Sequence, residues 1–66
     1  MKIMVNGESR DFRDGVTLEE VIKELGLVGK VMAAARNMQI VKQDKWNETV
    51  LQEGDKLELL DFVGGG

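Results

Sequence analysis

Alternating apolar and polar positions open the chain and predict its first strand. Ile3 and Val5 recur at the two-residue period of a half-buried strand, over about 2–6. Asn6-Gly7 follows, and both residues tolerate the positive φ angles of a two-residue type I′ turn. We therefore expect an antiparallel hairpin whose second strand covers about residues 9–12.

The period then lengthens to that of an amphipathic helix, predicted at about 17–25. Its apolar stripe has the spacing i, i+3, i+4, i+7 and consists of Leu18, Val21, Ile22 and Leu25. Thr17 and Glu20 have the spacing of a capping box, which satisfies backbone amides at a helix start. Gly26 stands where a left-handed residue commonly ends a helix.

Three further strands are expected after this helix. They cover about residues 31–37, 40–41 and 56–62, with an irregular turn at 44–46 between the last two. Trp46 is expected at the edge of the core, with its indole N–H donating to a carbonyl.

This order of elements predicts an α+β fold in a single domain. One main helix covers only one face of a mixed sheet of four to five strands, and the other face stays open. The first and last strands are expected side by side and parallel at the sheet centre, which is the β-grasp or ubiquitin-like arrangement. The β-grasp domain would cover residues 1–63, followed by a flexible glycine tail at 64–66.

Composition removes several classes of function. The 66 residues include no cysteine and no histidine, so a disulfide framework and the usual zinc ligands are excluded. The net charge is −3 and the basic residues are scattered, which argues against nucleic-acid or anionic-membrane partners. Glu8, Asp11 and Asp14 lack the spacing of a calcium loop. We expect a cytoplasmic protein with no metal, no intrinsically bound cofactor and no catalytic nucleophile–base pair.

Gly64-Gly65-Gly66 closes the sequence directly after the predicted last strand. Glycine has no Cβ, so such a tail is slender and can enter a narrow channel. Its carboxylate is inert at neutral pH until ATP converts it to an acyl adenylate, which a sulfur nucleophile can then attack. By itself, a run of three glycines is also typical of a frayed terminus.

With this tail, the chain resembles the ThiS/MoaD family of ubiquitin-like sulfur carriers, and most closely its thiamin-biosynthesis branch. The resemblance covers essentially the whole length and rests on several short stretches. They are Met1-Lys2-Ile3, Asn6-Gly7-Glu8, Asn37, Ile40-Val41, Trp46, Val50-Leu51, Gly54-Asp55 and Gly65-Gly66. Lys42 stands where proline is common in this branch, and Met38 where glycine or glutamine is common.

The resemblance implies a carrier that is acted on by enzymes and is not itself an enzyme. A ubiquitin-activating-type adenylyltransferase would consume ATP to adenylate the carboxylate of Gly66, with Gly65 behind it. Sulfur from a cysteine desulfurase would make a thiocarboxylate, which a thiazole synthase would use for the thiazole ring of thiamin. Carriers for molybdopterin or for cysteine and methionine synthesis, protein-conjugating modifiers and non-catalytic β-grasp binding modules are the alternatives.

The open face of the sheet is the predicted partner-binding surface. Ile3, Val5, Leu57 and Leu59 should face the helix, which turns Met4, Leu60 and Phe62 outward. Parallel central strands would bring Met4 and Leu60 together in one apolar patch beside Gly64, and exposed apolar surface usually marks an interaction site.

Two further features of this surface stay open. If Ala33 and Ala35 lie under the helix, Met32, Ala34 and Arg36 join the open face. Acidic residues also gather near the tail, where they form either a solvated surface or a patch that steers the carrier to a basic partner. They are Glu53, Asp55, Glu58 and Asp61.

Overall fold

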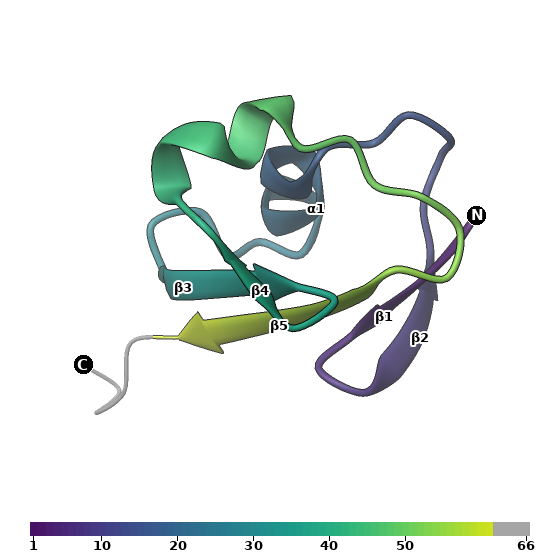
Figure 1. The fold of residues 1–66 in the computed structure, drawn as a ribbon, viewed down its shortest axis with the longest axis horizontal. Helices are drawn as coiled ribbons and strands as arrows, with labels where there is room; N and C mark the ends of the chain where they lie inside the picture. Colours follow the sequence, from purple (N-terminus) through teal and green to yellow (C-terminus); the bar gives the residue numbers. More distant parts are fainter. Residues whose placement is uncertain (62–66) are drawn as a thin grey trace.

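The computed structural model describes residues 1–61, so the predictions on Phe62 and the glycine tail lie outside the described residues. Five strands form one sheet, and both helical segments lie on the same side of it (Figure 1). The elements are β1 (Lys2–Val5), β2 (Glu8–Asp11), α1 (Leu18–Glu24), β3 (Val31–Arg36), β4 (Gln39–Val41), the 3₁₀ helix η1 (Gln43–Glu48) and β5 (Lys56–Asp61).

The strand order is β2-β1-β5-β3-β4, with β5 at the centre of the sheet. β1 runs parallel to β5, whereas β3 runs antiparallel to both β5 and β4. The predicted central pair of parallel strands is therefore confirmed, together with the α+β class and the β-grasp arrangement. No helix within residues 1–61 has the length and apolar character needed to cross a membrane.

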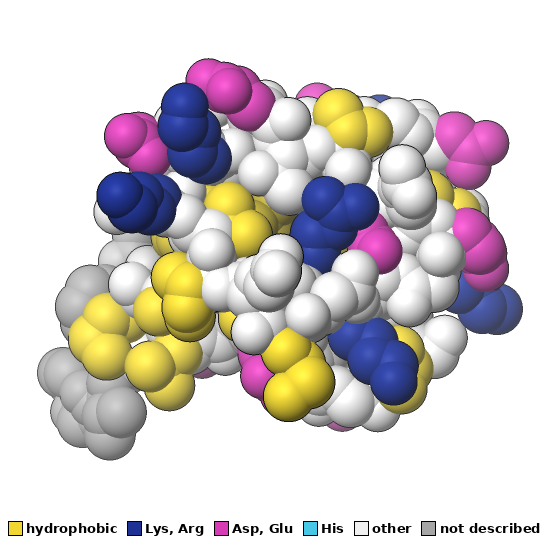
Figure 2. Space-filling model, viewed as in Figure 1, with side chains coloured by type: hydrophobic (Ala, Val, Ile, Leu, Met, Phe, Trp, Pro, Cys, Tyr) yellow, Lys and Arg dark blue, Asp and Glu magenta, His cyan; other side chains and the backbone are white. Residues whose placement is uncertain are grey.

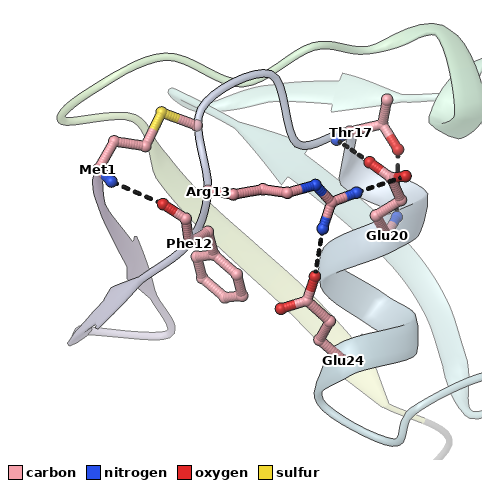
Figure 3. A network of polar contacts seen from close by, with 6 residues as sticks. All are labelled: Met1, Phe12, Arg13, Thr17, Glu20 and Glu24. Carbon is pink, nitrogen blue, oxygen red and sulfur yellow. Dashed lines mark hydrogen bonds and ion pairs between the residues drawn. The ribbon is translucent and has the colours of Figure 1, made fainter.

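α1 begins at the predicted capping box. The backbone N–H of Glu20 donates to Thr17 Oγ1 at 3.2 Å, and the N–H of Thr17 donates to Glu20 Oε1 at 2.9 Å. Arg13 adds ion pairs to Glu20 and Glu24, which join the preceding loop to the helix (Figure 3). The Thr17 backbone N–H and the charge of Arg13 hold the pKa of Glu20 below its ordinary value, against the opposing effect of burial. Gly26 has φ of 72°, as a left-handed helix end requires.

The core lies between α1 and the covered face of the sheet. Trp46 is buried, and its indole N–H donates to the carbonyl of Val41 at 2.9 Å, which confirms its predicted role. The buried hydrophobic residues are Ile3, Val5, Phe12, Val16, Leu18, Val21, Ile22, Val31, Ala34, Trp46, Leu51, Leu57 and Leu59.

The segment around Trp46 is more regular than predicted. The expected irregular turn at 44–46 is instead part of η1, which spans Gln43–Glu48. This stretch contains neither glycine nor proline to interrupt a helical turn, and the Lys45 N–H donates to the Lys42 carbonyl at 2.8 Å. Burial of one indole ring therefore organises a segment that has no apolar periodicity of its own.

β3 does not alternate simply between the two faces of the sheet. Its pairing with β5 shifts between Val31 and Ala33, as at a β-bulge, so that Val31 and Ala34 are both buried although they lie three residues apart. The interpretation that placed Ala33 and Ala35 under the helix is wrong. Ala34 is the alanine in the core.

Candidate functional site

β5 carries the chain through the centre of the sheet toward the glycine tail. On one edge it pairs with β1 through Met4↔Lys56 and Val5↔Leu57, and on the other it pairs with β3 from Leu57 to Asp61. Gly64, Gly65, Gly66 and Phe62, which the sequence placed at the site of chemistry and at partner contacts, lie outside the described residues. The described part of the site is the end of β5 and the open face around it.

As far as Asp61, the predicted orientation of side chains along the two central strands is correct. Ile3 and Leu57 are buried under α1, whereas Met4 is 37% exposed and Leu60 is 51% exposed on the open face. Their predicted adjacency is wrong, because Met4 pairs with Lys56, four residues before Leu60. At about 3.3 Å per residue, this offset separates the two side chains by roughly 13 Å along the strand. Alternation sets the face of a residue but not the offset between neighbouring strands.

A shallow apolar groove of about 440 Å³ lies on the β5–β3–β4 half of the open face. Ala33 pairs with Leu60, and Ala35 pairs with both Glu58 and Ile40, so small alanines form the floor between two larger apolar side chains. Ile40 is 73% exposed. In Figure 2, hydrophobic side chains gather at the side of the molecule where β5 ends. The groove is lined by Asn6, Ala33, Ala34, Ala35, Ile40, Glu58, Leu59 and Leu60.

The β1–β2 half of the open face carries Met4 but is otherwise polar. Lys2 Nζ and Asp11 Oδ1 form an ion pair at 3.0 Å across β1 and β2. Glu8 and Arg10 pair with the buried Val5 and Ile3, so they lie on the opposite, helix-covered side of the sheet, where they form an ion pair at 3.1 Å. Two of the three carboxylates considered as metal ligands are therefore engaged by basic side chains. Within residues 1–61, no three carboxylates come together in a group that could hold a metal ion.

Arg36 does not join the open face, so its predicted place there is wrong. It pairs with the buried Leu57 and therefore lies on the helix-covered side, where its Nε donates to Asp55 Oδ2 at 2.9 Å. The bulge in β3 causes this change, because it reverses the alternation between Val31 and the end of the strand.

Asp55 is the centre of a polar cluster at the start of β5, which we call the Asp55 cluster (Asp55, Arg36, Asn37 and Gln52). Its carboxylate accepts hydrogen bonds from Arg36, from Asn37 Nδ2 at 3.0 Å and from the Gln52 N–H at 2.8 Å. Burial alone would raise the pKa of Asp55, but these donors and the Arg36 charge hold it below its ordinary value.

The Asp55 cluster also corrects the predicted acidic patch near the tail. Asp55 is 7% exposed and satisfied internally, so it is not available to steer a partner. Glu53 lies at the same end of β5, where its Oε1 accepts the Lys2 N–H at 2.9 Å. Only Glu58 and Asp61 remain on the side of β5 that leads to the tail.

Asn6 contacts β5 in a way that sequence reasoning missed. Its Nδ2 donates to the Leu59 carbonyl at 3.2 Å, and its Oδ1 accepts the Leu59 N–H at 2.8 Å. We call these two bonds the Asn6 clamp. The sequence of Asn6 and Gly7 was interpreted only as a turn signal, and the φ of 49° at Asn6 confirms the turn. The available signal was the asparagine amide, which has both a donor and an acceptor to offer a neighbouring strand.

Comparison with known proteins gives the family. The sequence model of the ThiS family matches residues 3–66. The chain is 39% identical, over its full length, to a thiazole synthase from Paramagnetospirillum magneticum, of which it spans only 20%. It is 30% identical to the sulfur carrier protein ThiS of Escherichia coli, with 100% of both chains covered.

Solved structures agree on the fold. The crystal structure of a thiamine biosynthesis protein (ThiS) from Geobacter metallireducens superposes with a TM-score of 0.82 at 24% identity, covering 100% of both chains. With its mixed sheet, its capped helix and a match that runs from residue 3 through the terminal glycines, the chain belongs to the ThiS family.

Proposed function

We propose that this protein is a sulfur carrier of thiamine biosynthesis and that the carboxylate of Gly66 carries the sulfur. The observation that supports this most directly is the end-to-end match with the sulfur carrier protein ThiS of Escherichia coli. The family match also extends through the terminal glycines. The 39% identity to a segment of a thiazole synthase favours the thiamine branch over carriers for molybdopterin, cysteine or methionine.

The chemistry requires activation of an unreactive carboxylate. A carboxylate oxygen of Gly66 attacks the α-phosphorus of ATP, pyrophosphate leaves, and an acyl adenylate forms. A persulfide sulfur then attacks the carbonyl carbon and displaces AMP, which forms an acyl disulfide. A thiol reductant, such as excess cysteine, cleaves the S–S bond by thiol–disulfide exchange and leaves a thiocarboxylate, whereas hydrosulfide would give the thiocarboxylate directly. Cysteine is absent from the sequence, so the chain has no thiol on which to hold the sulfur as a persulfide.

The catalytic steps belong to partners. A ubiquitin-activating-type adenylyltransferase binds and consumes the ATP, a cysteine desulfurase supplies sulfur, and a thiazole synthase accepts it. The carrier contributes a rigid sheet whose central strand leads to Gly65 and Gly66. In this proposal it is a co-substrate in the cytoplasm and is not an enzyme.

The groove on the open face is the proposed docking surface for the adenylyltransferase. It borders the end of β5, so a partner bound there is close to the point where the chain leaves the sheet. Leu60 and Ile40 are its exposed apolar walls. Leu60→Ser should raise the KM for the carrier several-fold with little loss of stability, because the side chain is half exposed. Val50→Ser is the matched control, since Val50 is 50% exposed and lies outside the groove.

The direct test is intact-mass measurement after incubation with ATP, the adenylyltransferase, a cysteine desulfurase and cysteine. Replacement of one oxygen by sulfur adds about 16 Da. Deletion of Gly65 and Gly66 should abolish both this gain and ATP–pyrophosphate exchange, while the circular dichroism spectrum stays unchanged. Exchange that persists after the deletion would contradict the proposal, and absence of any gain in the intact chain would favour a binding module.

A further inference from the structure

One carboxylate lies inside the apolar groove on the open face. Among the described residues that line the groove, Glu58 is the only charged one. It is exposed on β5, and its neighbour on β3 is Ala35, which in turn pairs with Ile40 on β4. Leu60 follows two residues later on the same face of β5. Glu58 therefore lies between the two exposed apolar walls of the groove.

The Glu58 side chain has no partner within residues 1–61, where it forms neither an ion pair nor a hydrogen bond. Lys56 is on the same face two residues earlier, but the two side chains form no ion pair. The amide of Asn6, which also lines the groove, is engaged by the backbone of Leu59. By contrast, the Asp55 carboxylate on the same strand accepts three hydrogen bonds. The described part of the fold thus supplies no group that neutralises the charge of Glu58.

A partner that covers both walls of the groove also covers Glu58. Neighbouring strands lie about 4.8 Å apart and residues advance by about 3.3 Å, so Ile40 and Leu60 flank Glu58 at roughly 10 Å and 7 Å. An apolar surface laid over them would remove water from the carboxylate and offer no hydrogen bond in return, which is costly. A basic side chain avoids this cost, because its charged end donates to Glu58 while its methylene groups pack on the alanine floor.

Charge also narrows the choice of occupant. A second copy of this chain would bring another unpaired Glu58 and a net charge of −3 to the groove, and a polyanion would be repelled by the same carboxylate. The surface that fits is one of a different protein, apolar at its edges and basic at its centre.

We propose that Glu58 is the specificity-determining residue of this docking surface: it pairs with a basic side chain of the adenylyltransferase, which lies on the floor formed by Ala33 and Ala35. The inference rests on the proposed function, which assigns the groove to that enzyme. Ile40 and Leu60 contribute apolar contacts, whereas the charge pair selects the partner. A protein with an acidic or apolar group at the same point would leave the carboxylate covered and unpaired.

The test compares three changes of Glu58 with one control, using the full chain and an adenylyltransferase that supports ATP–pyrophosphate exchange with it. Glu58→Gln removes the charge and keeps the shape, Glu58→Lys reverses the charge, and Glu58→Leu makes the lining of the groove more apolar. Glu19→Gln is the matched control, because Glu19 is exposed on α1, on the other side of the sheet, and the change in net charge is the same.

The expected changes are in KM for the carrier, with kcat within about twofold of the unaltered chain. Glu58→Gln should raise KM about fivefold to twentyfold, and Glu58→Lys by at least about fiftyfold. Glu58→Leu should raise it about fivefold or more, because the basic group of the partner then loses its acceptor. Glu19→Gln should keep KM within about twofold. Thermal unfolding should show little change in any variant, because both glutamates are exposed.

The leucine variant separates this inference from a purely apolar groove. A lowered KM in Glu58→Leu would show that the partner presents an apolar surface at this point, and would overturn the inference. Equal rises of KM in Glu58→Gln and Glu19→Gln would also overturn it, since only the overall charge of the carrier would then matter. Unchanged KM in all the Glu58 variants would do the same while the proposed function stands. If the unaltered chain supports no exchange, the proposed function fails and the inference fails with it.

Titration calorimetry with the same enzyme in the absence of ATP measures docking apart from chemistry. The Kd of each Glu58 variant should rise by about the same factor as its KM. An unchanged Kd would show that Glu58 does not contact the docked enzyme and would overturn the inference. Sedimentation of the carrier alone tests the other occupant: a dimer of the unaltered chain that Glu58→Lys abolishes would assign the groove to a second copy, against the inference.

Discussion

Asn6 and Asn37 occupy the same place in two hairpins that flank β5. Each is the first residue of a two-residue turn with φ near 50°, and each donates its backbone N–H to a β5 carbonyl, Leu57 for Asn6 and Lys56 for Asn37. At both positions the chain turns away before its own carbonyl can pair, and the side-chain oxygen accepts a β5 N–H instead. The local structures are nearly equivalent.

The two asparagines differ in the direction in which they reach along β5. β1 is parallel to β5, so Asn6 at its end reaches forward to Leu59, whereas β3 is antiparallel, so Asn37 at its end reaches back to Lys56 and Asp55. Asn37 therefore adds hydrogen bonds at the start of β5, and Asn6 adds them nearer its end. The same type of asparagine turn contacts different ends of β5 because β1 and β3 run in opposite directions.

The start of β5 makes more side-chain hydrogen bonds than its end. The Asp55 carboxylate accepts hydrogen bonds from Arg36, from Asn37 and from the Gln52 N–H. The Gly54 N–H donates to the Lys2 carbonyl at 2.9 Å. At the other end, the β1–β2 hairpin contacts Leu59 through one side chain, and β3 pairs with the backbone of β5 as far as Asp61. We infer that side-chain hydrogen bonds stabilise mainly the start of β5, while its end is held by backbone pairing with β3 and by the Asn6 side chain.

The largest change in stability is expected when the start of β5 loses its central carboxylate, in Asp55→Ala. It should lower the free energy of unfolding by about 3 kcal/mol, because Arg36 and Asn37 lose a buried, charged acceptor together. Urea denaturation followed by circular dichroism gives the value. Asp61→Ala is the matched control at the other end of β5, where the exposed carboxylate should contribute less than about 0.5 kcal/mol. Equal losses in the two variants would show that the two ends are held alike.

Acidification should lower the free energy of unfolding less than Asp55→Ala does, because protonation removes the charge of Asp55 but leaves its oxygens in place. The pKa of Asp55 is lowered in the folded protein, so its contribution is fully present above its ordinary value of 3.8 and is lost as the pH falls through the folded pKa. Denaturation curves between pH 6 and pH 2, compared with those of Asp55→Asn, isolate this contribution. The variant should lose less stability on acidification, and parallel losses would assign the acid sensitivity to other groups such as Glu20.

The smallest effect concerns the second residue of each turn. Met38 has φ of 71°, which disfavours a side chain, whereas Gly7 meets the same requirement in the other hairpin with φ of 85°. Met38→Gly should raise the free energy of unfolding by about 0.5 to 1 kcal/mol, and Gly7→Met should lower it by a similar amount. Thermal unfolding measures both changes. A destabilised Met38→Gly would show that the 93% exposed side chain makes a contact that offsets its strain.

Much of the fold was predictable from short-range signals. The capping box of Thr17 and Glu20, the left-handed Gly26 and the inward positions of Ile3 and Leu57 all follow from spacing or from backbone preference, which neighbouring residues determine. The glycine tail and the motifs that carry the family resemblance are likewise visible in the linear chain.

The sequence by itself determined the order of the elements and the face that most strand residues present, because these depend on periods of two and 3.6 residues. Only the tertiary structure decided the offset of Met4 from Leu60 and the reversal that the β3 bulge imposes on Ala34 and Arg36. A period carries no information on the register between two strands. The contacts of Asn6 with Leu59 and of Arg36 with Asp55 join residues 53 and 19 positions apart, so they form only where the fold brings those strands together.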